Sequence, residues 1–171
     1  MTVMNRIFNL ILLLGLSWAT GCATSSKAKS DEETQTLISC HLESNDFGLD
    51  KTEEISVYRR RPEILRITKA AILDNADISR AVTVDRPGGV KSISIQFNQR
   101  GTLKLDSTTI ANKSKRIAIR AAFPESRWLA AVMIRNRIED GILLFTPDAT
   151  PEETERIVKG INELAEELQE D

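Results

Sequence analysis

The chain has 171 residues, a length that suits one domain with short extensions, and its 41% apolar and 28% charged residues are typical of a globular protein. A formal net charge of −2 offers no strongly basic face, so a nucleic acid partner is not expected. One histidine and two cysteines cannot build the usual four-ligand zinc site, and we expect neither a metal nor a cofactor. Metal binding by carboxylates alone is the alternative, although no loop has the spacing of an EF-hand.

The first twenty residues combine a short basic start with a short apolar run. Arg6 precedes residues 7–20, which are largely apolar and would span roughly 21 Å as a helix. The hydrocarbon core of a bilayer is about 30 Å thick, so this run is too short to cross it. A short positive start, an apolar stretch and small residues at its end predict an export signal.

Residues 19–22, ATGC, resemble the lipobox of bacterial lipoproteins, although the family most often has Leu at the position of Ala19. The resemblance implies cleavage after residue 21 and lipidation of Cys22 by fatty acids such as palmitate. Two or three acyl chains would anchor the chain stably to a membrane of the cell envelope. Ala23, in place of Asp, favours the periplasmic face of the outer membrane. An ordinary secretory signal with a chance cysteine and an uncleaved anchor are the alternatives.

The chain therefore divides into three parts. Residues 1–21 are predicted to be the lipoprotein signal peptide, and residues 22–35 the lipidated cysteine and a flexible tether. The tether is rich in Ser, Thr, Lys, Asp and Glu and has no apolar pattern. Residues 36–171 are predicted to form a single domain.

The domain begins with residues 36–44, where Ile38, Cys40 and Leu42 alternate on one face and predict a half-buried strand. We expect Cys40 to be a small core residue, although an odd thiol could also pair with another chain. His41 points to the other face and has no nucleophile or carboxylate cluster beside it, so a catalytic role is not expected.

Two short strands are predicted near residues 55–59 and 64–68, separated at Pro62. Arg59, Arg60 and Arg61 lie between them. This triplet is either a solvated turn or a contact for lipid phosphates beside the anchor.

Regular turn signals follow. Asp74 is predicted to cap a short helical turn, and residues 81–98 to form a hairpin that turns at Pro87-Gly88-Gly89. A helix ending near Asn112 is predicted because Leu103, Ser107 and Ile110 recur at helical spacing. Three more strands are predicted at residues 116–123, 127–134 and 141–145.

The last element has the clearest pattern. Thr150, Pro151 and Glu153 predict a capping box at the start of a helix of about 18 residues. The apolar stripe of this helix comprises Ile157, Val158, Ile161, Ala165 and Leu168, and we expect it to pack on a sheet. The fold class is thus α+β, a mostly antiparallel sheet with two main helices packed on one face.

The order of these pieces resembles the head subdomain in the first extracytoplasmic region of SecD, a component of the bacterial protein-export machinery. The match covers residues 73–168 and depends on an ordered series of short motifs. Its residues are Leu73, Asp74, Asp77, Ile78, Ala81, Gly101, Asn112, Arg116, Ile117, Ala118, Ile119, Ile134, Ile138, Gly141, Glu152 and Glu153.

The resemblance implies a fold and a polypeptide-contacting surface. The SecD head has no catalytic residues to transfer, and we transfer none. The sequence departs from the family at AAFPES, where the family usually has a Gly-rich turn, and at Ala131-Val132-Met133, where it often has Pro. The membrane helices of SecD are not in this sequence, so the resemblance does not imply proton-driven export.

Three classes of function remain open. The first is a non-catalytic protein-binding module that contacts envelope or exported proteins through an uncovered sheet face or edge, including by strand addition. Leu129, Ala131 and Met133, or their alternates Trp128, Ala130 and Val132, would supply an apolar patch unless both sets are covered. The second class is a self-associating structural protein of the envelope.

The third class is an enzyme, which the sequence does not favour. The chain has a single histidine and lacks a G-x-S-x-G elbow and a phosphate-binding glycine loop. Three carboxylate pairs are the remaining candidates for acid–base chemistry, and all are expected to be solvated. They are Asp46/Asp50, Glu53/Glu54 and Glu139/Asp140.

Overall fold

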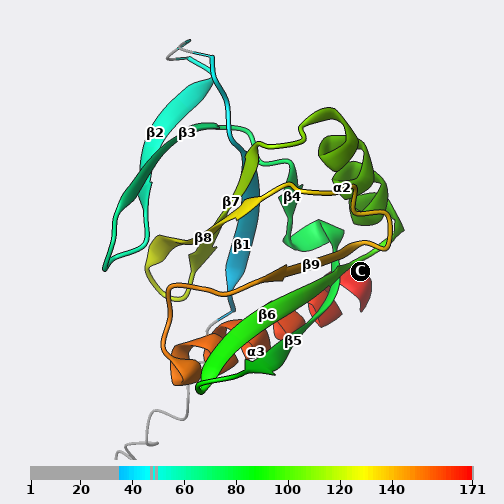
Figure 1. Ribbon diagram of the computed structural model, residues 1–171. Helices are drawn as coiled ribbons and strands as arrows, with labels where there is room; N and C mark the ends of the chain where they lie inside the picture. Colours follow the sequence, from blue (N-terminus) through cyan, green and yellow to red (C-terminus); the bar gives the residue numbers. More distant parts are fainter. Residues whose placement is uncertain (1–34, 47, 49, 171) are drawn as a thin grey trace, which may run out of the picture. The chain divides into compact units, whose positions relative to one another are not determined.

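The strands of the computed structural model, which describes residues 35–46, 48 and 50–170, lie in three antiparallel sheets (Figure 1). The first sheet has the order β4-β1-β7-β8. Its strands are β4 (Leu73–Asp74), β1 (Leu37–Leu42), β7 (Arg116–Ala122) and β8 (Ser126–Met133). The second pairs β2 (Thr52–Val57) with β3 (Glu63–Thr68). The third has the order β5-β6-β9. Its strands are β5 (Ile78–Arg86), β6 (Val90–Phe97) and β9 (Ile142–Phe145). The helices are the short η1 (Asn75–Asp77), α2 (Gln99–Ala111) and α3 (Pro151–Glu170).

The predicted α+β class is confirmed, with antiparallel strands and two main helices in the described part of the chain. The strands are distributed over three sheets, where the sequence analysis expected one. The alternation of apolar residues reports which face of a strand is buried, but it does not report which strands pair.

The local turn signals are found where the sequence predicted them. Asp74 caps η1, accepting a hydrogen bond from the backbone N–H of Ala76 at 3.0 Å. The β5–β6 hairpin turns at Gly88 and Gly89, whose φ angles of 82° and 74° suit glycine and few other residues.

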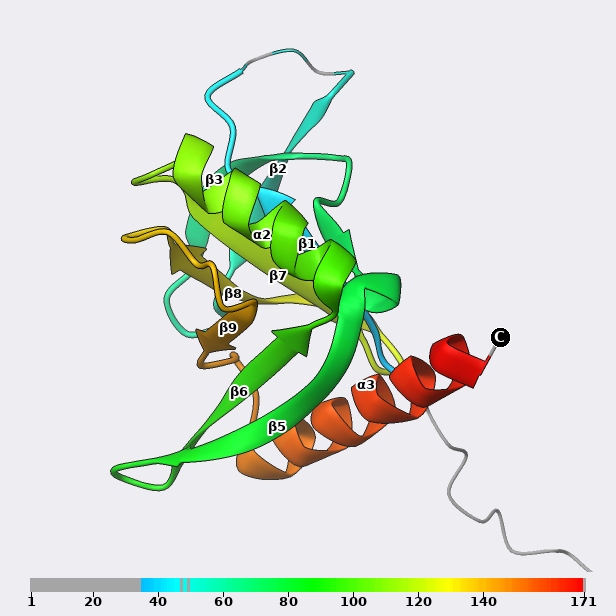
Figure 2. The same ribbon diagram turned by 90° about the vertical axis from the view of Figure 1, so that its right-hand side faces the viewer.

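Helix α3 runs beside β5 in both views (Figures 1 and 2). Thr150 and Glu153 form the predicted capping box: each side chain accepts a hydrogen bond from the other residue's backbone N–H, at 3.2 and 2.8 Å. Ile157, Ile161 and most of the predicted stripe are buried, whereas Leu168 at the far end is 46% exposed. The amphipathic pattern therefore predicted the packed face of this helix correctly.

Helix α2 is confirmed, but the residues whose spacing predicted it do not form its buried face. Leu103 and Ile110 are 64% and 57% exposed, while Gly101, Leu105 and Thr109 face the interior. The residues at 101, 105 and 109 have helical spacing too, but Gly and Thr carry little apolar signal. This face is buried because α2 approaches η1 closely at Gly101 and because Thr109 forms a hydrogen bond. The Thr109 hydroxyl accepts from the backbone N–H of Ile138 at 3.0 Å.

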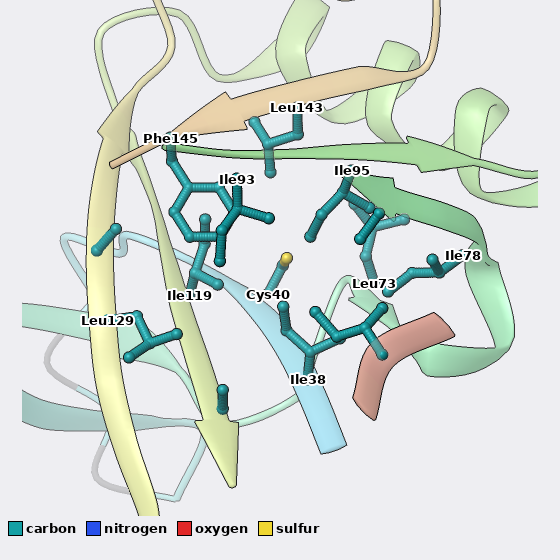
Figure 3. Packing of buried hydrophobic residues seen from close by; sticks show 14 of the residues in the cluster. Ile38, Cys40, Leu73, Ile78, Ile93, Ile95, Ile119, Leu129, Leu143 and Phe145 are labelled. Carbon is teal, nitrogen blue, oxygen red and sulfur yellow. The ribbon is translucent and has the colours of Figure 1, made fainter. Parts of the chain in front are cut away.

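The main core lies between the four-stranded sheet, the β5–β6–β9 sheet and the two helices (Figure 3). Cys40 lies inside it and is 2% exposed, so the core interpretation of this residue is confirmed. Burial, followed by the nearby Asp77 and Asp74 carboxylates, raises the pKa of the Cys40 thiol to about 12. A buried, protonated thiol is not available for pairing with another chain.

A smaller core covers the opposite face of the four-stranded sheet. The β2–β3 hairpin places Ile55, Val57, Leu65 and Ile67 against Ala118 of β7. Strand β7 is therefore covered on both faces, which explains the unbroken buried run Ile117-Ala118-Ile119.

Strand β8 does not alternate as the sequence analysis assumed. Ile119 pairs with Ala130 and Arg120 pairs with Trp128, so Leu129 is the extra residue of a β-bulge. Leu129 and Ala130 both join the main core, and Trp128 and Ala131 pack against the smaller one. Both candidate sets are therefore largely covered, and only Met133 remains 47% exposed.

Candidate functional site

The outer face of the β5–β6–β9 sheet exposes apolar side chains beside polar ones in the described part of the chain. Val82 lies opposite Ser94, and Ser94 lies opposite Leu144, so these three residues form one cross-strand row. Arg80, Gln96 and Ile142 form the next row, and Arg80 is exposed. Val82, Ile142 and Leu144 are 45%, 41% and 40% exposed, and we call the surface formed by these six residues the outer face.

The opposite face of the same sheet is part of the main core. Ala81, Ile95 and Leu143 are cross-strand neighbours there, and all three are buried. One face of the sheet is thus used for folding, whereas the outer face remains available for contact.

A groove of about 360 Å³ lies between the β2–β3 hairpin and β8. Tyr58, Pro62 and Trp128 supply its apolar lining, and Arg59, Arg127 and Asp148 its charged groups. The Tyr58 hydroxyl accepts a hydrogen bond from the Ala131 N–H at 3.1 Å. This contact attaches the hairpin to β8.

The charges of the groove neutralise one another. Arg59 contacts Asp148 at 3.1 Å, and Arg127 donates to both carboxylate oxygens of Glu153 at 3.2 and 3.1 Å. These hydrogen bonds from Arg127, with that from the Thr150 backbone, hold the pKa of the Glu153 carboxyl below its usual value. A paired network of this kind provides no free charge for binding or acid–base chemistry.

Among the described residues, Asp77 has the most buried acidic side chain, with none of its side-chain surface exposed. Its carboxylate accepts hydrogen bonds from Arg100 Nε at 2.7 Å and from Lys104 Nζ at 2.8 Å, and also from the Asp74 N–H. Burial by itself raises the pKa of Asp77, but these hydrogen bonds outweigh burial and lower the pKa below its usual value. Asp77 thus fastens α2 to η1.

The remaining SecD-like motif residues also maintain the fold. At Gly101, a Cβ would lie 2.5 Å from the Asp77 carbonyl oxygen, so only glycine lets α2 approach η1 this closely. Gly141 has a φ of 68° and lies against Thr102. Asn112 is the C-cap of α2, and Arg116 pairs with Glu63. The motif therefore describes a structural framework rather than a reactive centre.

His41 has structural contacts as well. It is 4% exposed, its Nδ1 donates to the Thr68 carbonyl at 2.9 Å, and Nε2 lies 3.0 Å from the Ser39 hydroxyl. Its ring meets Trp128 edge-on, with ring centroids 5.3 Å apart. Both ring nitrogens are engaged within the fold.

The three carboxylate pairs are not brought together into a cleft. Five of the six side chains are exposed, and only Glu53 is partly buried. Among residues 35–46, 48 and 50–170, no group of three or more His, Cys, Asp and Glu side chains could hold a metal ion.

The three residues of the arginine triplet, Arg59, Arg60 and Arg61, have different environments. Arg59 is bound to Asp148, through its backbone N–H at 2.8 Å as well as through its side chain. Arg60 and Arg61 are exposed at the turn of the β2–β3 hairpin. The predicted lipidation site, Cys22, lies outside the described residues.

Three residues that form long-range hydrogen bonds were not predicted from the sequence. Tyr58, Asp148 and Asn162 each bond a strand or hairpin distant in sequence, and no local pattern marks them. The positive φ of Tyr58, 67°, could not be predicted either, because the left-handed region is rare for an aromatic residue. Within the described residues, no helix is long and apolar enough to cross a membrane.

Comparison with known proteins finds similarity in structure alone. No protein-family model matches the chain, and no curated protein matches its sequence. One similar solved structure is that of "a membrane component SecDF that enhances protein export", with a TM-score of 0.55 and 16% identity over 76% of this chain and 63% of that chain. Another is SecDF in its super-membrane-facing form, with a TM-score of 0.56 and 18% identity over 75% of this chain and 19% of that chain.

These likenesses confirm the SecD-like fold that the sequence motifs implied. The chain spans less than two thirds of the length of either SecDF chain, so it corresponds to a part of that protein. At this level of identity, what is shared is the arrangement of strands and helices, and the described domain has a SecD-like fold.

Proposed function

We propose that this chain is a lipid-anchored protein of the cell envelope whose folded part is a non-catalytic protein-binding module, accessory to protein export. The observation that carries the proposal is the fold, which is similar to SecDF, a membrane component that enhances protein export. The outer face supports it, because exposed apolar surface next to polar residues is typical of protein contact sites.

The anchor in this proposal is lipid on Cys22. Signal cleavage after residue 21 would leave residues 22–35 as a tether and residues 36–171 as the domain held at the membrane, with the outer membrane favoured by Ala23. Growth with a labelled fatty acid tests the anchor directly. The native chain should carry label and shift on a gel, and Cys22→Ser should do neither; an unlabelled native chain would contradict the anchor.

A non-catalytic role is supported by how the polar groups are used. Asp77, Glu153 and His41 are each engaged in contacts that fasten elements of the fold together. The exposed carboxylates lie at the surface, where solvated charge is their ordinary state.

In-cell crosslinking tests the binding role. The anchored protein would be crosslinked in its own cells and its partners identified by mass spectrometry, with Cys22→Ser as the unanchored control. Capture of export-channel subunits or of many secreted chains, dependent on Cys22, is the expected result. Capture of the chain's own copies alone would instead support a self-associating structural protein, and would overturn the link to export.

A further inference from the structure

Two strand edges of the fold are each capped at one residue by a side chain that imitates a neighbouring strand. On β8, the Tyr58 hydroxyl bonds both the N–H and the C=O of Ala131. On β5, the Asn162 amide accepts from the Ala81 N–H at 2.7 Å and donates to the Ala81 C=O at 3.0 Å. Such capping satisfies backbone groups that would otherwise offer a template for another chain.

On the outer edge of β9, no side chain among the described residues bonds both the N–H and the C=O of one residue. The Phe97 N–H donates to the Gly141 C=O at 2.9 Å, and the register therefore directs the backbone groups of Leu143 and Phe145 toward β6. Those of Ile142 and Leu144 point away from β6. Asp140 accepts from the Ile142 N–H at 3.1 Å, but the Ile142 C=O and both backbone groups of Leu144 have no partner in the described part of the chain.

The side chains of Ile142 and Leu144 do not protect this edge. Ile142 and Leu144 are 41% and 40% exposed and lie on the outer face. The outer edge of β2 offers an instructive contrast, because it carries Glu54 and Ser56, and Glu54 pairs with Arg66. Charged and polar edge residues discourage strand pairing, whereas exposed apolar residues favour it.

We propose that the β9 edge binds an extended segment of another polypeptide by strand addition, with apolar side chains at alternate positions of that segment. This inference rests on the proposed protein-binding function and names its site. The added strand would bond the Ile142 C=O and the Leu144 N–H and C=O. Its apolar side chains would continue the row that runs from Val82 through Ser94 to Leu144.

Fluorescence anisotropy with the full chain tests the site. The probe is a fluorescein-labelled ten-residue peptide of alternating valine and threonine with a lysine at each end. Leu144→Pro removes the outward N–H and leaves the bonds to β6 in place, since those come from Leu143 and Phe145. We expect it to weaken binding by about tenfold or more, and Leu144→Ala, which keeps the N–H, by only about threefold.

Two controls keep the test decisive if Leu144→Pro fails to fold. Leu144→Lys places a charge on the edge and should also weaken binding by about tenfold, while Leu103→Lys, on the exposed side of α2, should leave binding unchanged. In amide hydrogen exchange, saturating peptide should slow exchange at Leu144 by about tenfold and leave Leu143, already bonded to β6, unaffected.

The outcomes separate the site from the function. If the peptide binds and the Leu144 variants bind as well as the native chain, the β9 site is wrong and protein binding stands. If the native chain binds no peptide, but crosslinking captures exported chains, strand addition is again overturned and the function stands. If neither assay detects a polypeptide partner, both proposals fail.

Discussion

The two main helices are held to the sheets by different physical means. Helix α3 buries a continuous apolar stripe, in which Ile157 and Ile161 are fully buried. Helix α2 buries Gly101, Leu105 and Thr109 and leaves Leu103 and Ile110 exposed. Its position depends on the Asp77 ion pairs and on the close approach at Gly101. The comparison teaches that an apolar stripe identifies the packed face of a helix only when burial of apolar area is what holds the helix.

The largest effect is expected for the apolar contact of α3. Ile161→Ala should lower the free energy of unfolding by about 2–5 kcal/mol, because a fully buried side chain is replaced by a cavity. Leu168→Ala, on the same stripe but 46% exposed, should cost less than about 1 kcal/mol. Urea unfolding of both variants measures the difference, and equal losses would show that the stripe is not the anchor of α3.

The next effect concerns the close approach of α2. Gly101→Ala should cost about 1–3 kcal/mol, because its Cβ would lie 2.5 Å from the Asp77 carbonyl oxygen and 2.9 Å from the Phe97 Cβ. Elsewhere in a helix the same change is stabilising. A rise in the thermal midpoint of Gly101→Ala would contradict the contact, and the exposed Ser107→Ala on the same helix is the matched control.

The ion pairs of Asp77 should produce a dependence of stability on pH. Asp77→Asn should cost about 2 kcal/mol at neutral pH, since Arg100 and Lys104 lose a buried carboxylate partner. The folded pKa of Asp77 is lowered, so the carboxylate stabilises the native chain above its unfolded pKa of about 3.9. That contribution is lost as the pH falls through the lowered folded value.

Denaturant titrations at several pH values check this dependence. Below about pH 4, the native chain should lose stability more steeply than Asp77→Asn, and the two curves should converge. Parallel curves would show that Asp77 does not contribute in this way. Asp106→Asn, which breaks only the surface pair with Arg137, should have a smaller effect.

The smallest effect is expected on the exposed side of α2. Leu103→Ala and Ile110→Ala should each change the free energy of unfolding by less than about 0.5 kcal/mol, since neither side chain packs into the core. A loss of 2 kcal/mol or more, about the cost of truncating a buried residue, would mean that this side of α2 is covered. Chemical denaturation of the purified chain provides the measurement.

Much of the fold could be predicted because its signals are local. The strand at Ile38 and Cys40, the turn at Gly88 and Gly89 and the capping box of Thr150 and Glu153 depend on residues within a few positions of one another. The ordered motifs also indicated the SecD-like fold, and the structure shows their physical meaning: Asp77 and Gly101 meet across 24 positions of sequence.

The sequence predicted the type of candidate site, but not the residues that form it. The expectation of an uncovered sheet face or edge applies to the β5–β6–β9 sheet, but the candidate residues on β8 are largely covered. A single inserted residue, Leu129, reverses the alternation of that strand, and the β2–β3 hairpin covers its other face. Neither event leaves a periodic signal in the sequence.

The sequence by itself determined the elements of this protein, their caps and their order, because hydrogen bonds and apolar periodicity within a segment are short-range properties. Only the tertiary structure decided how the strands divide into three sheets, which side of α2 is buried and which edges are closed. The Asn162 side chain that caps β5 at Ala81 is 81 residues away along the chain. Such contacts form only when the whole chain has packed. No contact of this kind caps Leu144 on the edge of β9 in the described part of the chain.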